Sequence, residues 1–196
     1  MLDKKQARRA AHLLLLVLCF APLAVLGLDA LRGALGADPV ETIEHRTGDW
    51  ARRLLLAALA VTPLRRLSGW SFLAPWRRSL GLFAFAYALL HFTIFLALDL
   101  EFDFGSLARE VAKRPYVTLG FSALLLLAPL ALTSTRAWQR RLGRRWVSLH
   151  RLVYPAALLG VLHFVWLVKA DLAKPLAYAA ALAALLATRL LRVARA

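Results

Sequence analysis

The chain has 196 residues, enough for one domain, and 61% of them are hydrophobic. Because soluble proteins contain about 45–50% apolar residues, this composition excludes an ordinary water-soluble fold and predicts an integral membrane protein. The net charge of +15 suits either a nucleic acid or an anionic membrane surface, but the basic residues lie in short clusters between apolar runs, so we expect a lipid bilayer and no nucleic acid.

Six apolar segments follow one another along the chain, and each is predicted to be a transmembrane helix. A helix needs roughly 20 residues to cross the hydrocarbon core. The second segment is the weakest, because only residues 54–64 are uncharged between Arg53 and Arg65. We predict that it crosses with its arginines reaching the interface; a re-entrant segment is the alternative. The six segments cover residues about 10–28, 50–67, 79–98, 115–133, 149–168 and 175–191.

Basic and acidic residues alternate between successive connections. Every acidic residue except Asp3 lies in a connection that has few basic clusters, such as 29–49 or 99–110. The positive-inside rule then places both termini and the basic connections in the cytoplasm, which an even number of crossings satisfies. The predicted fold is a single all-α domain, residues 1–196, with six transmembrane helices. The basic clusters occupy residues 4–9, 65–78, 136–145 and 189–195.

Two histidines lie well inside apolar segments, where an ionisable side chain is costly and is by default a functional candidate. His91 lies in the third segment and His163 in the fifth. Both segments start at the cytoplasmic side, and at 1.5 Å per residue each histidine lies roughly 20 Å beyond that start. This matched depth, in the outer half of the membrane, would let two imidazoles bind one iron from opposite sides. Structural histidines bonded to a neighbouring helix are the alternative.

A third histidine, His150, precedes His163 on the predicted fifth helix. It lies about 20 Å nearer the cytoplasm, which suits a second redox centre in the inner leaflet, although the two side chains point about 140° apart on an ideal helix. Pro155 lies between them and can kink the helix.

Haem fits these histidines better than other metal centres do. No cysteine or carboxylate lies near them in the spans, which disfavours most zinc and copper sites. Haem needs only axial ligands and a dry, aromatic slot. Aromatic candidates for this slot are Phe83, Phe85, Tyr87, Phe92, Phe95, Phe164 and Trp166, and the glycines expected to admit the macrocycle are Gly81, Gly120 and Gly160.

Other polar residues have weaker assignments. His45 lies in an outer connection and is either a surface residue or a group on the quinone or partner side, and His12 is expected at the cytoplasmic interface.

Two other functions stay open: a small proton-coupled transporter that uses the histidines as a relay, and a cofactor-free membrane anchor. None of the 11 acidic residues lies centrally in a span, which disfavours the transporter. Candidate contacts to haem propionates are Arg77, Arg78 and Arg151.

Several motifs resemble those of the MsrQ (YedZ) family, haem-binding membrane subunits within the wider ferric-reductase-like transmembrane group. The longest is LTSTRAWQRRLGRRWVSLHRLVY, residues 132–154. The others are EHRTGDW (44–50), VTPLRRL (61–67), the RR-to-LLH stretch (77–91), RPYVTLG (114–120) and HFVWLVK (163–169).

The resemblance implies a multi-pass protein of the bacterial inner membrane with haem b, one or two copies, and FMN. It implies that the protein takes electrons from membrane quinol and passes them to a periplasmic molybdopterin subunit, MsrP, which reduces methionine sulfoxide in oxidised proteins. The chain would be an electron-transfer subunit rather than the catalytic one. The family's haem ligands carry over onto His91, His150 and His163. The wider group has a further histidine one leaflet before the position of His91; here Arg77 and Arg78 stand there, so His150 lacks its expected partner.

Overall fold

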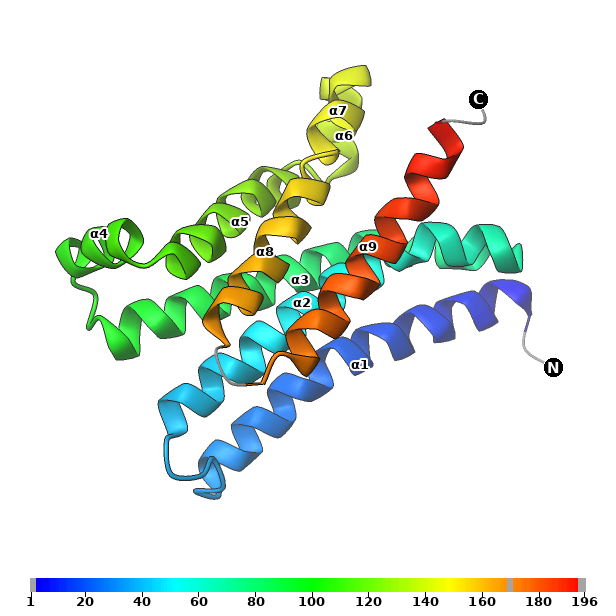
Figure 1. The fold of residues 1–196 in the computed structure, drawn as a ribbon. Helices are drawn as coiled ribbons and strands as arrows, with labels where there is room; N and C mark the ends of the chain where they lie inside the picture. The colour runs from blue at the N-terminus through cyan, green and yellow to red at the C-terminus, as the bar shows by residue number, and fades with distance from the viewer. Residues whose placement is uncertain (1–2, 169–170, 194–196) are drawn as a thin grey trace. The chain divides into compact units, whose positions relative to one another are not determined.

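The computed structural model describes residues 3–168 and 171–193, and all regular elements within these ranges are helical (Figure 1). The all-α prediction is therefore confirmed for this part of the chain. Lys169, in the last of the family motifs, and Arg195, in the C-terminal basic cluster, lie outside the described residues. The helices form two compact units, Met1–Ile94 and Phe95–Ala196, and each is described below by itself.

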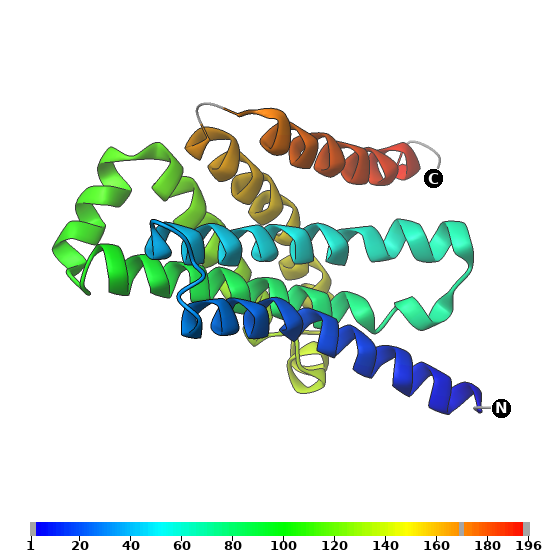
Figure 2. The same cartoon turned by 90° about the horizontal axis from the view of Figure 1, so that it is seen from below.

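The first unit contains three long helices and one short one. They are α1 (Lys4–Leu31), α2 (Pro39–Ser68), the short 3-10 helix η1 (Ser71–Leu73) and α3 (Trp76–Ile94). Helices α2 and α3 lie side by side and run in opposite directions (Figure 2). The Tyr87 hydroxyl donates to the Cys19 carbonyl at 2.8 Å, and this bond joins α3 to α1.

Helix α2 begins earlier than the sequence analysis predicted. It starts at Pro39, whereas the second span was expected from residue 50 and residues 29–49 were expected to be a polar connection with room for a short interfacial helix. The start has a clear local cause: the Asp38 carboxylate accepts the Glu41 N–H at 2.9 Å, and Pro39 occupies the first helical position. With 30 residues, α2 is about 45 Å long, which is longer than the apolar core of a bilayer, about 30 Å.

The second unit begins with a π-helical turn, η2 (Phe95–Asp99), and an amphipathic helix, α4 (Phe104–Lys113). Two long helices then pack against each other, α5 (Pro115–Leu132) and α8 (Val153–Leu167), and α9 (Ala173–Val193) packs against α8. The connection between α5 and α8 contains two short basic helices, α6 (Arg136–Leu142) and α7 (Arg144–His150).

The fifth predicted span is interrupted, so His150 and His163 lie on different helices. His150 ends α7, a two-residue turn follows, and α8 begins at Val153. Pro155 explains the interruption, because proline has no N–H to donate to the Arg151 carbonyl and its ring crowds that carbonyl. The Arg151 carbonyl instead accepts the Tyr154 N–H at 3.0 Å.

Four helical segments among the described residues are long and apolar enough to cross a membrane, judged by length and composition. The α1 segment shows why this suits a lipid environment: Leu13, Val17 and Phe20 are all more than half exposed, a surface that water would disfavour. A multi-pass membrane protein is thus confirmed. The crossings by α2 and α9, and hence the total of six, stay predictions. The four segments are Lys5–Leu31, Ser71–Asp99, Pro115–Leu132 and Arg144–Leu167.

Candidate functional site

In the first unit, the imidazole of His91 lies against the backbone of α2. Its Nδ1 atom is 3.0 Å from the Glu44 carbonyl oxygen. One helical turn further along α2, Gly48 is buried and faces the same ring: a Cβ atom there would be 3.3 Å from His91 Cε1. Any larger residue at position 48 would therefore press on the imidazole.

The second unit repeats this arrangement with different residues. The Nδ1 atom of His163, on α8, is 2.7 Å from the Tyr116 carbonyl oxygen at the start of α5. One turn later, Gly120 packs under the ring so closely that a Cβ atom would be 2.8 Å from Nδ1. The contact is tighter than the one at Gly48, so an alanine there forces the ring or the helix to move.

The two histidine sites also have the same spacing along the sequence. In both cases the carbonyl belongs to the residue 47 positions before the histidine, and the glycine lies 43 positions before it (91 − 48 and 163 − 120). Gly48 is not among the glycines that the sequence predicted to lie beside a macrocycle. The equal Gly-to-His spacing is the signal in the sequence that could have revealed this pair of sites.

The hydrogen bonds determine which ring nitrogen can bind a metal. A carbonyl oxygen only accepts, so Nδ1 carries the proton in both His91 and His163. In the neutral imidazole the lone pair then lies on Nε2, the usual ligand atom when Nδ1–H bonds a backbone carbonyl. The donor set of these two residues therefore fits axial ligation of a haem iron. In residues 3–168 and 171–193, no group of three or more His, Cys, Asp or Glu side chains could hold a metal ion by itself.

His150 lies in a different setting from the other two. Its Nδ1 is 3.1 Å from the Trp146 carbonyl of its own helix, and its ring stacks on the Trp146 indole with centroids 3.8 Å apart. The indole N–H donates to the Thr133 carbonyl at the end of α5. His150 is thus held by the α7 segment, and the Nδ1-protonated form again leaves the lone pair on Nε2.

The aromatic residues predicted to line a haem slot are divided between the two units. Phe83 makes an edge-on contact with Phe20 of α1, and Tyr87 also contacts α1. Phe164 packs edge-on against Tyr178 of α9, while Trp166 is mostly exposed. Of the glycines expected to admit a macrocycle, Gly120 lies against His163, whereas Gly81 and Gly160 have no atom within 4 Å of an added Cβ.

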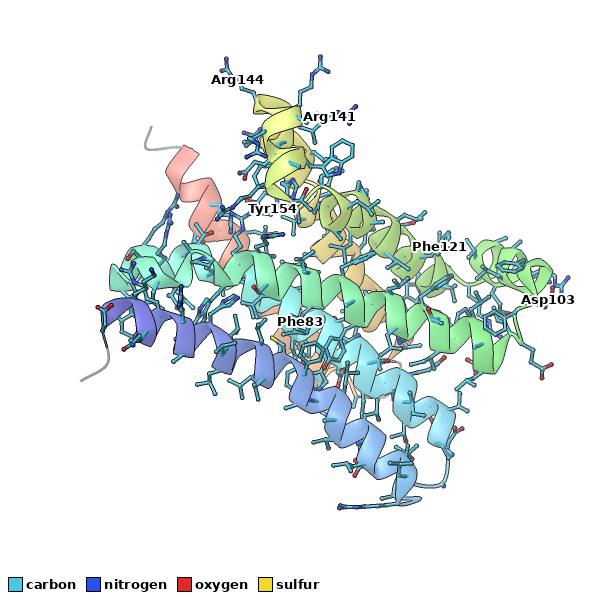
Figure 3. The ribbon with its side chains drawn as sticks, turned by 180° about the vertical axis from the view of Figure 1, so that it is seen from behind. Phe83, Asp103, Phe121, Arg141, Arg144 and Tyr154 are labelled. Carbon is cyan, nitrogen blue, oxygen red and sulfur yellow. The ribbon has the colours of Figure 1, made fainter. Side chains whose placement is uncertain are left out.

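The remaining predicted residues lie on exposed parts of the helices. Arg77 and Arg78 are exposed in the first turn of α3, and Arg151 is exposed just after α7. His45 is exposed on α2, with Nε2 3.9 Å from a Glu41 carboxylate oxygen. The basic character of the α6–α7 segment is visible in Figure 3, where the labelled Arg141 and Arg144 point away from the helices.

His12 lies nearer the N-terminus of α1 than Cys19 and Phe20, which contact α3. His12 is half-buried, and its Nδ1 has no hydrogen-bond partner among the described residues. A single buried ring nitrogen is a much weaker metal-site signal than the paired arrangements at His91 and His163. The location of His12 at the membrane interface therefore stays a prediction.

Comparison with known proteins gives a consistent family. The family described as "Ferric reductase like transmembrane component" matches residues 47–161. The chain is 53% identical over 189 residues to the protein-methionine-sulfoxide reductase haem-binding subunit MsrQ of Xanthomonas campestris pv. campestris (strain 8004), covering 93% of this chain and 85% of that protein. It is 49% identical over 192 residues to MsrQ of Rhodospirillum rubrum, covering 97% and 92%. No solved structure matches.

Proposed function

The chain belongs to the ferric-reductase-like transmembrane family and, within it, to the MsrQ haem-binding subunits of the bacterial inner membrane, and on that premise we propose that it is the electron-transfer subunit of a methionine-sulfoxide reductase system. His91 and His163 are its axial haem ligands. His150 is a candidate ligand nearer the cytoplasm.

The repeated His–carbonyl–Gly arrangement is the observation that carries this proposal. Two histidines on apolar helices each commit Nδ1–H to a backbone carbonyl, and each ring lies on a glycine. A histidine needed only for packing does not require this orientation twice with the same spacing. A hydrogen bond from Nδ1–H to a carbonyl also raises the basicity of Nε2 and fixes the ring orientation.

Haem b, when bound, supplies a one-electron carrier whose potential depends on its axial ligands and on burial. The chain's own residues do the rest. The Glu44 and Tyr116 carbonyls hold the proton at Nδ1 of the two histidines. The apolar helices exclude water from the rings. Arg77, Arg78 and Arg151 are at the cytoplasmic edge, so they are candidates to neutralise the propionates of a haem near His150.

The electron route is the finer part of the proposal. Membrane quinol is the donor, and the acceptor is a periplasmic molybdopterin subunit of the MsrP kind that reduces methionine sulfoxide in oxidised proteins. FMN is a second cofactor for which no residue is assigned. The relatives' printed name, a haem-binding subunit of a protein-methionine-sulfoxide reductase, supports the system to which the chain is assigned. The exposed position of His45 on α2 suits the quinone or partner side.

The proposed orientation has both termini in the cytoplasm, following the charge distribution. Helix α1 then runs from the cytoplasm to the periplasm and α2 returns. The charged N-terminal part of α2 therefore lies at the periplasmic surface of the inner membrane. The His91 site, which lies against Glu44 and Gly48 of that part, is therefore in the outer leaflet.

Absorption spectroscopy of the purified protein tests this function. We expect a Soret band and visible bands that change when dithionite is added. His91→Ala and His163→Ala should each lose haem while still inserting into the membrane, because each removes an axial ligand. His45→Ala, which changes an exposed histidine, is the matched control and should keep its haem. A colourless wild-type protein, or normal haem content in both ligand variants, would contradict the proposal.

A further inference from the structure

A cavity of about 480 Å³ lies in the first unit, between α1 and α2, with Tyr87 of α3 also lining it. Its walls are largely apolar, from Leu18 and Leu26 of α1 and the Trp50 indole of α2. Pro22 also lines it, and because proline has no N–H, the Leu18 carbonyl receives no helical hydrogen bond from position 22.

The charged side chains that line the cavity all come from one stretch of α2. They are Arg46, Asp49 and Arg53. Asp49 is ion-paired with Arg53 at 3.6 Å and also with Arg52, while Arg46 is ion-paired with Asp29. The Arg53 guanidinium also lies over the Trp50 ring, 5.0 Å from its centroid. Both arginines of the cavity are thus already ion-paired with a carboxylate, and Asp49 is shared between Arg52 and Arg53.

These existing ion pairs favour a neutral ligand head group. A phosphate of a lipid would meet the Asp49 carboxylate and compete with it for Arg53, so an anionic head group gains little here. A hydroquinone ring is neutral, its hydroxyls can donate to the carboxylate, and its oxygens can accept from a guanidinium. Its ring can stack on the indole, and its apolar tail suits the leucine-lined wall and the surrounding lipid.

The cavity and the His91 site lie on different faces of the same turns of α2. At 100° per residue, Glu44, Gly48 and the next turn face roughly one direction, whereas Asp49 and Arg53 face about 100–140° away from Gly48. A helix with its side chains is about 10–12 Å across. A ligand in the cavity therefore lies about one helix diameter from the imidazole of His91.

We infer that this α1–α2 cavity is the quinol-binding site of the protein. The inference rests on the proposed function, which supplies the electron acceptor. Oxidation of the quinol to quinone breaks two O–H bonds and releases two protons and two electrons. Asp49 accepts the first proton, and water at the open mouth of the cavity accepts the second. With haem bound, His91 would hold the electron acceptor, and one quinol would supply two one-electron equivalents to it.

Filling the cavity is the direct test. Ala21 lines it, whereas Ala24, three residues along α1, is exposed and does not. Ala21→Trp and Ala24→Trp thus place the same bulk inside and outside the site. Decylubiquinone binding to the haem-loaded proteins in nanodiscs is measured by calorimetry, and decylubiquinol-driven haem reduction by stopped-flow absorption. We expect Ala21→Trp to weaken binding and slow reduction at least tenfold, and Ala24→Trp to match wild type, with equal haem content and dithionite reduction throughout.

A second pair of variants keeps the test decisive if Ala21→Trp does not fold. Asp49→Asn removes the proton acceptor without changing shape and should slow quinol-driven reduction, while Asp99→Asn, an exposed carboxylate outside the cavity, should not. Wild-type rates in both Ala21→Trp and Asp49→Asn would overturn the cavity assignment but leave the proposed function intact. The same holds if Ala21→Trp loses only bound phospholipid. A wild-type haem that decylubiquinol cannot reduce would instead overturn the quinol donor of the proposed function, and the cavity assignment with it.

Discussion

The imidazole of His163 lies directly on Gly120, where a Cβ atom would be 2.8 Å from Nδ1 and 3.1 Å from Cε1. The same ring nitrogen is 2.7 Å from the Tyr116 carbonyl one turn earlier on α5. The glycine is therefore needed for the ring to approach the backbone closely enough to donate its proton. This contact joins α5 to α8 and sets which nitrogen of His163 is available to a metal.

Gly120→Ala should disturb haem binding more than Gly48→Ala or Gly27→Ala. The added methyl group displaces the ring, at a cost of about 1–3 kcal/mol typical of overpacking, and lengthens the bond to Tyr116. We expect a lower haem-to-protein ratio, measured by the pyridine haemochrome assay, and an altered haem potential. A purely structural role would lower protein yield but leave the potential of the remaining haem unchanged.

Gly48→Ala should have a smaller effect of the same kind. The methyl group would be 3.3 Å from His91 Cε1, so a displacement of a few tenths of an ångström relieves the contact. Gly27→Ala is the matched control, because an added Cβ at Gly27 of α1 would have no described atom within 4 Å apart from its chain neighbours and its own helix backbone. That change should be neutral, or stabilising by up to about 1 kcal/mol through helix propensity. Equal haem content and potential in all three variants would show that the glycines do not position the histidines.

His150→Ala separates the inner histidine from the other two. His150 bonds the Trp146 carbonyl of its own short helix, so its removal leaves the His163–Tyr116 bond intact. We expect the variant to keep the haem held by His91 and His163, seen as a low-spin ferric spectrum. Its haem-to-protein ratio then reports whether a second haem is present. Complete loss of haem would contradict this expectation, because the haem would then depend on His150 as well.

Asp103 should make the start of α4 sensitive to acid. The Ser106 hydroxyl, and then the Ser106 and Gly105 N–H groups, hold the pKa of Asp103 below its ordinary value. Because the folded pKa is lowered, the stabilising contribution is present above the unfolded pKa and is lost as pH falls through the folded one. Hydrogen exchange of α4 amides, corrected for intrinsic rates, should speed up over that acidic range. Asp103→Asn should abolish this pH dependence; an unchanged dependence would assign it to another group.

The sequence was more informative about candidate histidines than about what holds them. His91 and His163 could be singled out as candidates because ionisable residues are costly inside apolar spans. Their partners could not, because Glu44 and Tyr116 contribute only backbone carbonyls, and these become partners only when α2 packs on α3 and α5 on α8. Side-chain identity therefore gives no sign of them.

The start of α2 and the break between α7 and α8 also differ from what the sequence predicted. The Asp38–Pro39 start of α2 is a recognisable helix-start pattern, but the run of charges after it made residues 29–49 look like a polar connection. Pro155 was expected to kink one continuous helix, whereas the loss of its N–H ends α7 and begins α8. In both cases a local hydrogen bond at a helix terminus decided the boundary, and hydropathy alone does not report such bonds.

The central claim is that the Nε2 atom of His163 binds haem iron, and ligand rescue tests it most directly. Ferric wild-type protein should show a low-spin, bis-histidine electron paramagnetic resonance spectrum. His163→Ala reconstituted with hemin should be high-spin, and added imidazole should restore the low-spin signal by occupying the vacated position. A His163→Ala protein that stays low-spin without imidazole would contradict the claim, because the iron would then have another ligand in that place.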